Sequence, residues 1–155
     1  MEPKLILSLS EWTVVNAFEK LFPKTEGYSI AIPSSRQQKG FDIIVYNLFS
    51  KRALTFQIKG SRTYTPDPPV KETTKRYKYY TWFNAFKIRP GHSDYYILFG
   101  LFVKTPKDNN SIQLKVKNWY DFILLLLTEN DIIDLINNLE FKTKEGTDTK
   151  FGFGF

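Results

Sequence analysis

Two neighbouring segments, 41–46 and 53–59, are rich in the β-branched and aromatic residues that are typical of β-strands. In the second segment apolar and polar residues also alternate, as in a strand that buries one face. The segments read FDIIVY and ALTFQIK, and a short connection that contains Asn47, Ser50 and Lys51 fits a turn. Because successive side chains of a strand point to opposite faces, Gln57 and Lys59 are expected side by side on one face. Asp42 opens the neighbouring strand. The two strands therefore bring an acid, an amide and a lysine together.

A helix is predicted upstream, from Ser10 to Phe22, with Ser10 as its N-cap and Pro23 ending it. Its apolar face has residues spaced three and four apart, namely Val14, Val15, Phe18 and Phe22. Glu11 lies on the same face, one turn earlier. Two interpretations of Glu11 are open: a first-turn acid that stabilises the helix dipole by about 0.3–1 kcal/mol, or a carboxylate directed at the sheet and its metal.

Further strands are predicted along the rest of the chain. Residues 28–32, YSIAI, alternate as a short strand, and the apolar run at 95–103 is typical of a strand buried on both faces. A turn at 106–110 precedes another alternating strand at 112–116. Residues 122–127 predict one more buried strand. The order is therefore one helix, three strands, a connection and further strands.

The C-terminal part of the chain predicts a last helix and an irregular tail. Thr128 and Asp131 resemble a capping pair, and helical spacing follows at Ile132, Ile133, Leu135, Ile136 and Leu139. The tail from Thr143 ends in FGFGF and is expected to be loose, or held against a partner through its phenylalanines.

In the middle of the chain, the prolines of the segment TPDPP at 65–69 exclude a regular helix or a central strand there. Residues 77–88 fit either a strand or a helix.

Composition narrows the class of protein. A length of 155 residues fits a single domain. We expect a core at about 10–104, a C-terminal strand–helix extension at 105–142 and a loose tail at 143–155. The chain has no cysteine and a single histidine, His92, which excludes disulfides and zinc sites built from cysteines or several histidines. No apolar run is long enough for a signal peptide or a membrane span, so we expect a cytoplasmic protein without a membrane partner.

Positive charge is concentrated in one part of the chain. The net charge is +6, and the segment from Lys59 to Arg89 holds eight lysines and arginines against Asp67 and Glu72. Aromatic residues are interleaved with these cations. Cations attract phosphates and aromatic faces stack on unpaired bases, although a core of aromatics with a solvated basic rim fits the same pattern. The candidate nucleic-acid-binding residues are Arg62, Lys71, Lys75, Arg76, Lys78, Tyr79, Tyr80 and Trp82.

These elements together resemble the PD-(D/E)XK nuclease superfamily, which includes many restriction endonucleases and Holliday-junction resolvases. In that family an acid begins the second core strand and an acid-x-Lys motif lies on the third. Asp42 matches the first acid, and Gln57-Ile58-Lys59 matches the motif in its Q-x-K form. Glu11 matches the carboxylate that many members carry on the preceding helix. The resemblance covers Ser10 to about Val103, and implies an α/β fold with a restriction-endonuclease-like αβββαβ core, a central mixed sheet flanked by helices.

The resemblance also implies an activity, which is metal-dependent endonuclease cleavage of DNA. Magnesium, with manganese as a substitute, would be held by Asp42, the Gln57 amide and the Ile58 carbonyl, with Glu11 as a further ligand, directly or through a bound water. Lys59 would orient the water or stabilise charge in the transition state. Gln57 departs from the family pattern because it carries no charge, which weakens metal binding. The alternative function is a catalytically inactive, nucleic-acid-binding protein with the same fold.

The expected partner is DNA, and RNA is left open. Many relatives form homodimers to cut two strands, so a homodimer is part of the expectation, although no interface can be read from the sequence. No other chemistry competes, because a phosphate-binding GxxxxGK loop is absent from the sequence.

Overall fold

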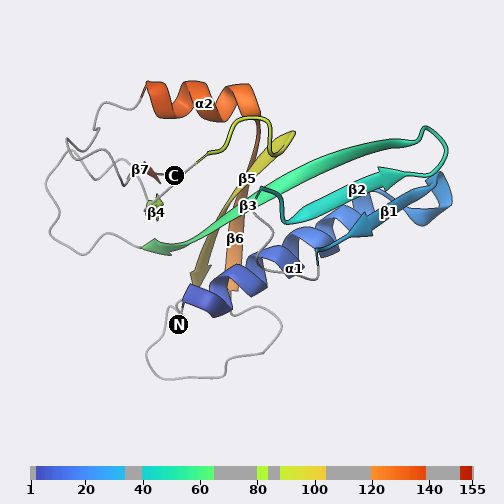
Figure 1. The fold of residues 1–155 in the computed structure, drawn as a ribbon. Coiled ribbons are helices and arrows are strands. Elements are labelled where there is room, and N and C mark those ends of the chain that lie inside the picture. The colour runs from blue at the N-terminus through green and yellow to red at the C-terminus, as the bar shows by residue number, and fades with distance from the viewer. Residues whose placement is uncertain are drawn as a thin grey trace, which may run out of the picture.

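The long helix α1, Pro3–Leu21, opens the fold (Figure 1). The computed structural model describes residues 3–33, 40–64, 80–83, 88–103, 120–138 and 151–154. Ser10 lies in the middle of α1 and is fully buried, so the prediction that it caps the helix is wrong. Glu11 lies about two turns inside the helix. Its interpretation as a first-turn acid is therefore wrong as well.

One face of α1 packs on the sheet, as the helical spacing predicts. Val14, Val15 and Phe18 are buried there. The Phe18 ring meets the ring of Phe56 on strand β3 (Arg52–Tyr64) edge to face, with centroids 4.7 Å apart. Such aromatic pairs contribute about 0.5–1.5 kcal/mol beyond the area that they bury. The helix ends next to Pro23, as predicted, and the 3-10 turn η1, Lys24–Glu26, leads to the first strand.

The sheet is mixed and open. Strands β1 (Tyr28–Ala31), β2 (Ile43–Asn47) and β3 form an antiparallel meander. β3 also pairs in parallel with β5 (Tyr95–Val103), and β5 pairs antiparallel with β6 (Tyr120–Thr128). The spatial order is thus β1-β2-β3-β5-β6. The strands expected at 28–32, 41–46, 53–59 and 95–103 are confirmed to within a few residues at their ends.

The two faces of the sheet carry two separate cores. Phe56 and Ile58 of β3 face α1 with Ile97, Phe99 and Leu101 of β5. By alternation, Gln57 and Lys59 lie on the opposite face, in register with Tyr96 and Leu98. That second core also contains Phe83, and Ile132 of helix α2 (Glu129–Asn137). The candidate site is therefore on the α2 side of the sheet.

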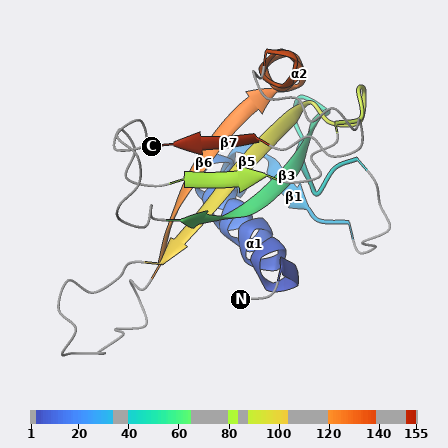
Figure 2. The same cartoon turned by 90° about the vertical axis from the view of Figure 1, so that its left-hand side faces the viewer.

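A short ribbon formed by β4 (Tyr80–Phe83) and β7 (Phe151–Gly154) is added to the end of β3. Figure 2 shows these two strands side by side, crossing the strands of the main sheet. The Thr63 and Thr81 hydroxyls lie 2.7 Å apart where β4 joins β3. Residues 80–83 therefore form a strand, within the segment that the sequence left open. The expectation of a loose tail is wrong at 151–154.

The C-terminal extension has the predicted order of strand and helix, but its strand is less buried than expected. Leu126 of β6 is 53% exposed and Phe122 is 39% exposed, so the expectation of a buried strand at 122–127 is wrong. Among the described residues, β6 pairs with β5 along one edge and has no strand on its other edge. At its end, Thr128 and Asp131 form the predicted capping box of α2, with the Asp131 N–H donating to the Thr128 hydroxyl at 3.2 Å.

The fold class is therefore α/β, with a mixed open sheet and helices α1 and α2. In the part of the chain that the structure describes, no helix is long and apolar enough to cross a membrane. The predicted turn at 106–110, the predicted strand at 112–116 and the proline-rich segment at 65–69 lie outside the described residues. The connection from β3 to β5 includes β4. The family resemblance implies a helix in this connection, and the described residues of the connection contain none.

Candidate active site

Asp42 lies immediately before β2, where the chain leaves its regular pairing with β3. Its backbone N–H donates to the Phe56 carbonyl at 2.8 Å. Its carboxylate Oδ2 accepts a hydrogen bond from the Ile58 N–H at 2.6 Å. The regular ladder between the two strands ends at the pair Ile43–Phe56. The Asp42 side chain therefore continues the pairing of β3 by one further hydrogen bond.

Ile58 presents its backbone to the same edge of β3. The N–H and C=O of one strand residue point to the same side, so the Ile58 carbonyl is directed toward the Asp42 side of the strand. The other edge of β3 is paired with β5 from Phe56 to Arg62. The Asp42 carboxylate and the Ile58 carbonyl thus place two oxygen atoms at the same edge of the sheet.

The loop before Asp42 is braced by the turn that leads into β5. The Ser93 hydroxyl donates to the Gly40 carbonyl, and both residues are buried. Gly40 has φ +143°, and an added Cβ there would lie 2.8 Å from Nδ1 of His92. Only glycine fits this close approach without strain. This contact fixes the chain two residues before the carboxylate.

The electrostatic environments of Asp42 and Lys59 displace both groups toward their neutral forms. Burial raises the pKa of Asp42, while the hydrogen bond from Ile58 and the charge of Lys59 lower it in part. Burial lowers the pKa of Lys59, the Asp42 charge raises it, and the positive charge of Arg89 lowers it further. Perturbed acids and bases that lie next to each other are typical of active sites, although structural ion pairs produce the same shifts.

Arg89 is a site residue that sequence analysis did not single out. It lies just before β5 and its side chain is exposed. The hydroxyl of the buried Tyr96 donates to its carbonyl at 3.5 Å, which holds this part of the chain against the face that carries Lys59. Two cations and one carboxylate then share this region. The only signal in the sequence was its membership in the basic segment.

Glu11 lies on the helix that covers the opposite face. The buried residues of α1 pack against Phe56 and Ile58, whereas Gln57 and Lys59 lie on the α2 side of β3. Glu11 is half-buried on the packed face of α1, one turn before Val14 and Val15. The structure therefore brings Asp42, Ile58 and Lys59 together, with Gln57 two residues before Lys59 on the same face of β3, and places Glu11 on the other face of the sheet.

Two of the predicted nucleic-acid-binding residues have described side chains. Arg62 is half-buried on the α1 face of β3, opposite to Lys59. Trp82 is 51% exposed, and its ring lies so close to Gly152 that a Cβ there would be 2.9 Å from it. Tyr80 begins β4. The other five, which are Lys71, Lys75, Arg76, Lys78 and Tyr79, lie outside the described residues.

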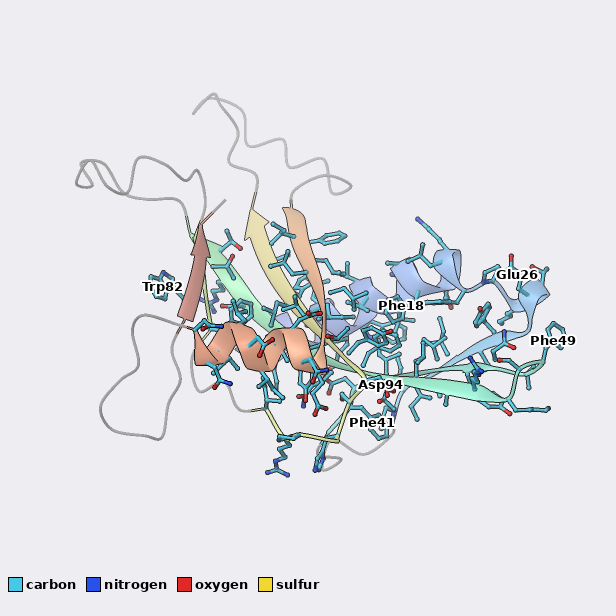
Figure 3. The ribbon with its side chains drawn as sticks, turned by 90° about the horizontal axis from the view of Figure 1, so that it is seen from above. Phe18, Glu26, Phe41, Phe49, Trp82 and Asp94 are labelled. Carbon is cyan, nitrogen blue, oxygen red and sulfur yellow. The ribbon has the colours of Figure 1, made fainter. Side chains whose placement is uncertain are left out.

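An open cavity of about 570 Å³ adjoins the site. It lies between the start of β3, the start of β5 and the start of α2, and Figure 3 labels two of its lining residues, Phe41 and Asp94. Phe41 and Thr55 connect it to the Asp42 region. The Asp94 carboxylate accepts from the Thr55 N–H and hydroxyl, both at 2.7 Å, and the Glu129 carboxylate accepts from the Gly91 N–H. These two acids therefore hold the walls of the cavity.

The donors at the site suit a hard divalent cation. A carboxylate, a backbone carbonyl and an amide are oxygen ligands of the type that Mg²⁺ accepts alongside several waters. No group of three or more His, Cys, Asp or Glu side chains that could hold a metal occurs within the ranges that the structure describes. Asp42 would therefore supply the negative charge, with neutral donors from Gln57 and Ile58.

Comparisons with protein-family models, with curated proteins and with solved structures found no match to this chain.

Proposed function

We propose that this protein is a metal-dependent endonuclease that hydrolyses phosphodiester bonds in DNA. The observation that carries the proposal is the junction of Asp42, Ile58 and Lys59. There a half-buried carboxylate meets a half-buried lysine at the point where β2 leaves β3. The resemblance of this D…QxK arrangement to the PD-(D/E)XK superfamily supports the same assignment. The order β1-β2-β3-β5, with β3 parallel to β5, agrees with that resemblance.

The residues have separate roles in this proposal. Asp42, the Ile58 carbonyl and the Gln57 amide would hold magnesium or manganese. A bound metal supplies charge neutralisation at the phosphate and lowers the pKa of a coordinated water. Lys59 would approach the scissile phosphate and stabilise the charge that develops there. Arg89, exposed beside Lys59, would contact a neighbouring phosphate. A homodimer that cuts both strands remains part of the proposal.

The test is a cleavage assay on supercoiled and linear DNA with Mg²⁺ or Mn²⁺, with EDTA as the blank. We expect cleavage that falls by about 10²–10⁴-fold in Lys59→Ala, a range typical of the loss of one positioned catalytic group. Lys20→Ala, an exposed lysine in the last turn of α1, is the matched control and should cleave like the wild type. Cleavage that persists unchanged in both Asp42→Asn and Lys59→Ala would exclude this site.

One observation favours a second candidate, a nucleic-acid-binding protein without catalysis. The junction contains a single carboxylate, which already accepts the Ile58 N–H, and Gln57 adds no charge. Such a site binds a divalent cation more weakly than one with two acids. Binding of DNA that weakens steeply with salt, without cleavage in either metal, would support this candidate over the nuclease.

A further inference from the structure

The turn between β2 and β3 exposes two large apolar side chains at the end of a long arm. Phe49 is 77% exposed and Leu48 is 51% exposed. Figure 3 shows Phe49 at one end of the molecule and Trp82 near the other, with Phe41 and Asp94 between them. An aromatic ring placed at the outermost point of a hairpin contributes nothing to the core. Its position needs an explanation outside the packing of the fold.

The turn is held rigidly. The Asn47 side-chain oxygen accepts from the N–H groups of Phe49 at 3.0 Å and Ser50 at 2.8 Å, and the Asn47 amide donates to the Glu26 carbonyl at 3.0 Å. The Leu48 N–H donates to the Gly27 carbonyl at 2.7 Å. These bonds tie the turn to η1 from two directions. Phe49 is thus presented on a fixed support.

One side of the Phe49 ring is seated on Gly27. A Cβ at Gly27 would lie 2.6 Å from Cδ2 of Phe49, and Gly27 has φ +79°, which side chains other than glycine rarely adopt. The backbone of Gly27 therefore supports the ring, and most of the remaining surface faces solvent. A ring in this arrangement is ready to stack on a flat partner at little cost in side-chain entropy.

The surroundings of the ring are positively charged. Lys24, Lys51 and Arg52 are exposed around the turn, and Glu26 is the one acid among residues 24–27 and 47–52. Three cations minus one acid leave a local charge of +2. A flat apolar ring among cations matches the chemistry of nucleic acid, whose bases stack and whose phosphates carry negative charge.

The arm between this turn and Lys59 offers a path for such a ligand. On the face that α1 does not cover, Ser29 and Ala31 of β1 and Ala53 of β3 are exposed and uncharged. Ile44 and Tyr46 of β2 lie between them on the same face and are half-buried. Lys59 follows Arg52 by seven positions along the chain. At about 3.3 Å per residue this is about 23 Å, or about seven nucleotides at about 3.4 Å each.

We propose that Phe49 stacks on an unpaired base of a nucleic acid whose flanking phosphates bind Lys51 and Arg52. This inference rests on the proposed function, which it deepens by naming the substrate as DNA with an unpaired base about seven nucleotides from the scissile phosphate. The contact itself needs no catalysis and is tested separately.

The experiment uses the full chain and a fluorescent duplex with a single unpaired 2-aminopurine. Binding of the wild type should quench the probe through stacking. Phe49→Ala should lose the quench and weaken binding by about 5- to 150-fold, the range for one base–aromatic stack, whereas Phe49→Trp should retain both. Trp12→Ala, which removes an exposed aromatic residue from α1, is the matched control and should behave like the wild type.

Two further measurements decide between this proposal and other partners. Lys51→Glu and Arg52→Glu should reduce the salt dependence of binding, while Lys20→Glu should not. Equal quenching by the wild type and Phe49→Ala would overturn the proposal, as would Phe49-dependent flotation with anionic vesicles in place of DNA binding. If cleavage is absent but the Phe49-dependent quench is present, the proposed nuclease fails and the stacking contact stands.

Discussion

The carboxylate of Asp42 lies 2.6 Å from the backbone nitrogen of Ile58, and this hydrogen bond joins the start of β2 to the middle of β3. The same side chain thus has a structural role and is also the central acid of the candidate site. The two roles require different properties of the side chain. An acceptor oxygen is sufficient for the hydrogen bond, whereas neutralising the charge of a bound cation or forming an ion pair with Lys59 requires a negative charge. Substitutions can therefore separate them.

Asp42→Ala and Asp42→Asn should differ in stability. Alanine leaves the Ile58 N–H without its acceptor and should lower the free energy of unfolding by about 1–3 kcal/mol. Asparagine retains an acceptor oxygen and removes the charge. Burial raises the pKa of Asp42 above its ordinary value of 3.8, so the native state binds a proton more readily than the unfolded state does. The wild type therefore loses stability as pH rises from 3.8 through the raised native pKa.

Urea unfolding as a function of pH measures this effect. Asp42→Asn should lack that loss and should be at least as stable as the wild type at neutral pH, while its DNA cleavage is abolished. If asparagine destabilises the protein as much as alanine does, the charge itself is structural, and Asp42 is better explained as part of an ion pair with Lys59.

Arg89→Gln should raise the pKa of Lys59. Arg89 lowers that pKa by like-charge repulsion, although burial is the larger cause, so the substitution removes only part of the shift. If protonated Lys59 stabilises the transition state, the loss of cleavage at high pH should move to higher pH in the variant. An NMR titration of the Lys59 side-chain amine measures the same pKa change directly and does not depend on cleavage activity.

Arg52→Gln provides the control for this titration, because Arg52 is exposed at the far end of β3. It should leave the Lys59 titration unchanged. An identical Lys59 pKa in the wild type and in Arg89→Gln would remove Arg89 from the site.

Gly100→Ala should loosen the contact of β4 with the main sheet. An added Cβ would lie 2.9 Å from each of three atoms, Cγ2 of Ile123 and the hydroxyl oxygens of Thr63 and Thr81. Overpacking of this kind typically costs about 1–3 kcal/mol. Thermal unfolding should show the loss. Gly91→Ala separates crowding from backbone strain. Its added Cβ would meet nothing within 4 Å, so its cost of about 1–2 kcal/mol would come from the φ of +77° alone.

Paired measurements make the outcome specific. Exchange of the amide hydrogens of β4 should accelerate in Gly100→Ala and remain unchanged in Gly91→Ala. Equal protection of β4 in both variants would argue against the close packing of Gly100 under Thr81.

Thr128→Ala should destabilise α2 by about 1 kcal/mol through loss of its N-cap. The hydrogen bonds from the Thr128 hydroxyl and N–H lower the pKa of Asp131. A lowered carboxylate pKa stabilises the fold above the unfolded value and loses that contribution as pH falls through the native value. The acid side of the stability profile should therefore flatten in Thr128→Ala, which acid titration followed by circular dichroism measures; Thr128→Ser should retain the wild-type profile.

Local patterns predicted most of the regular elements. Alternation located β1 and β3, enrichment in β-branched and aromatic residues located β2, and a continuous apolar run located β5, because these strands bury apolar faces whatever their neighbours are. The start of α1 was misplaced because Ser10 has the side chain of an N-cap, and nothing local indicates that a serine will be buried within a helix. β7 was missed because glycines alternate with its phenylalanines, and its pairing partner β4 is remote in sequence.

The candidate site was predictable only in part. Asp42 and the Gln57–Lys59 segment lie on adjacent strands of one hairpin, so their proximity follows from local register. The influence of Arg89 on Lys59 depends on the return of the chain into β5, which no pairwise pattern reveals. The layer that carries Glu11 was also undetermined, because helical spacing identifies the buried face of a helix but not the side of the sheet on which it packs.

The parallel pairing of β3 with β5 has a consequence for the order of folding. Lys59 and Leu98 are paired across 39 residues of chain, whereas the Asp42–Ile58 bond spans 16. Contacts between residues close in sequence form earlier, because less chain entropy is lost in closing the loop. The meander that contains Asp42 and Ile58 should therefore be structured while β5 is still unpaired, with the β5 edge of β3 open to solvent until the second half of the sheet forms.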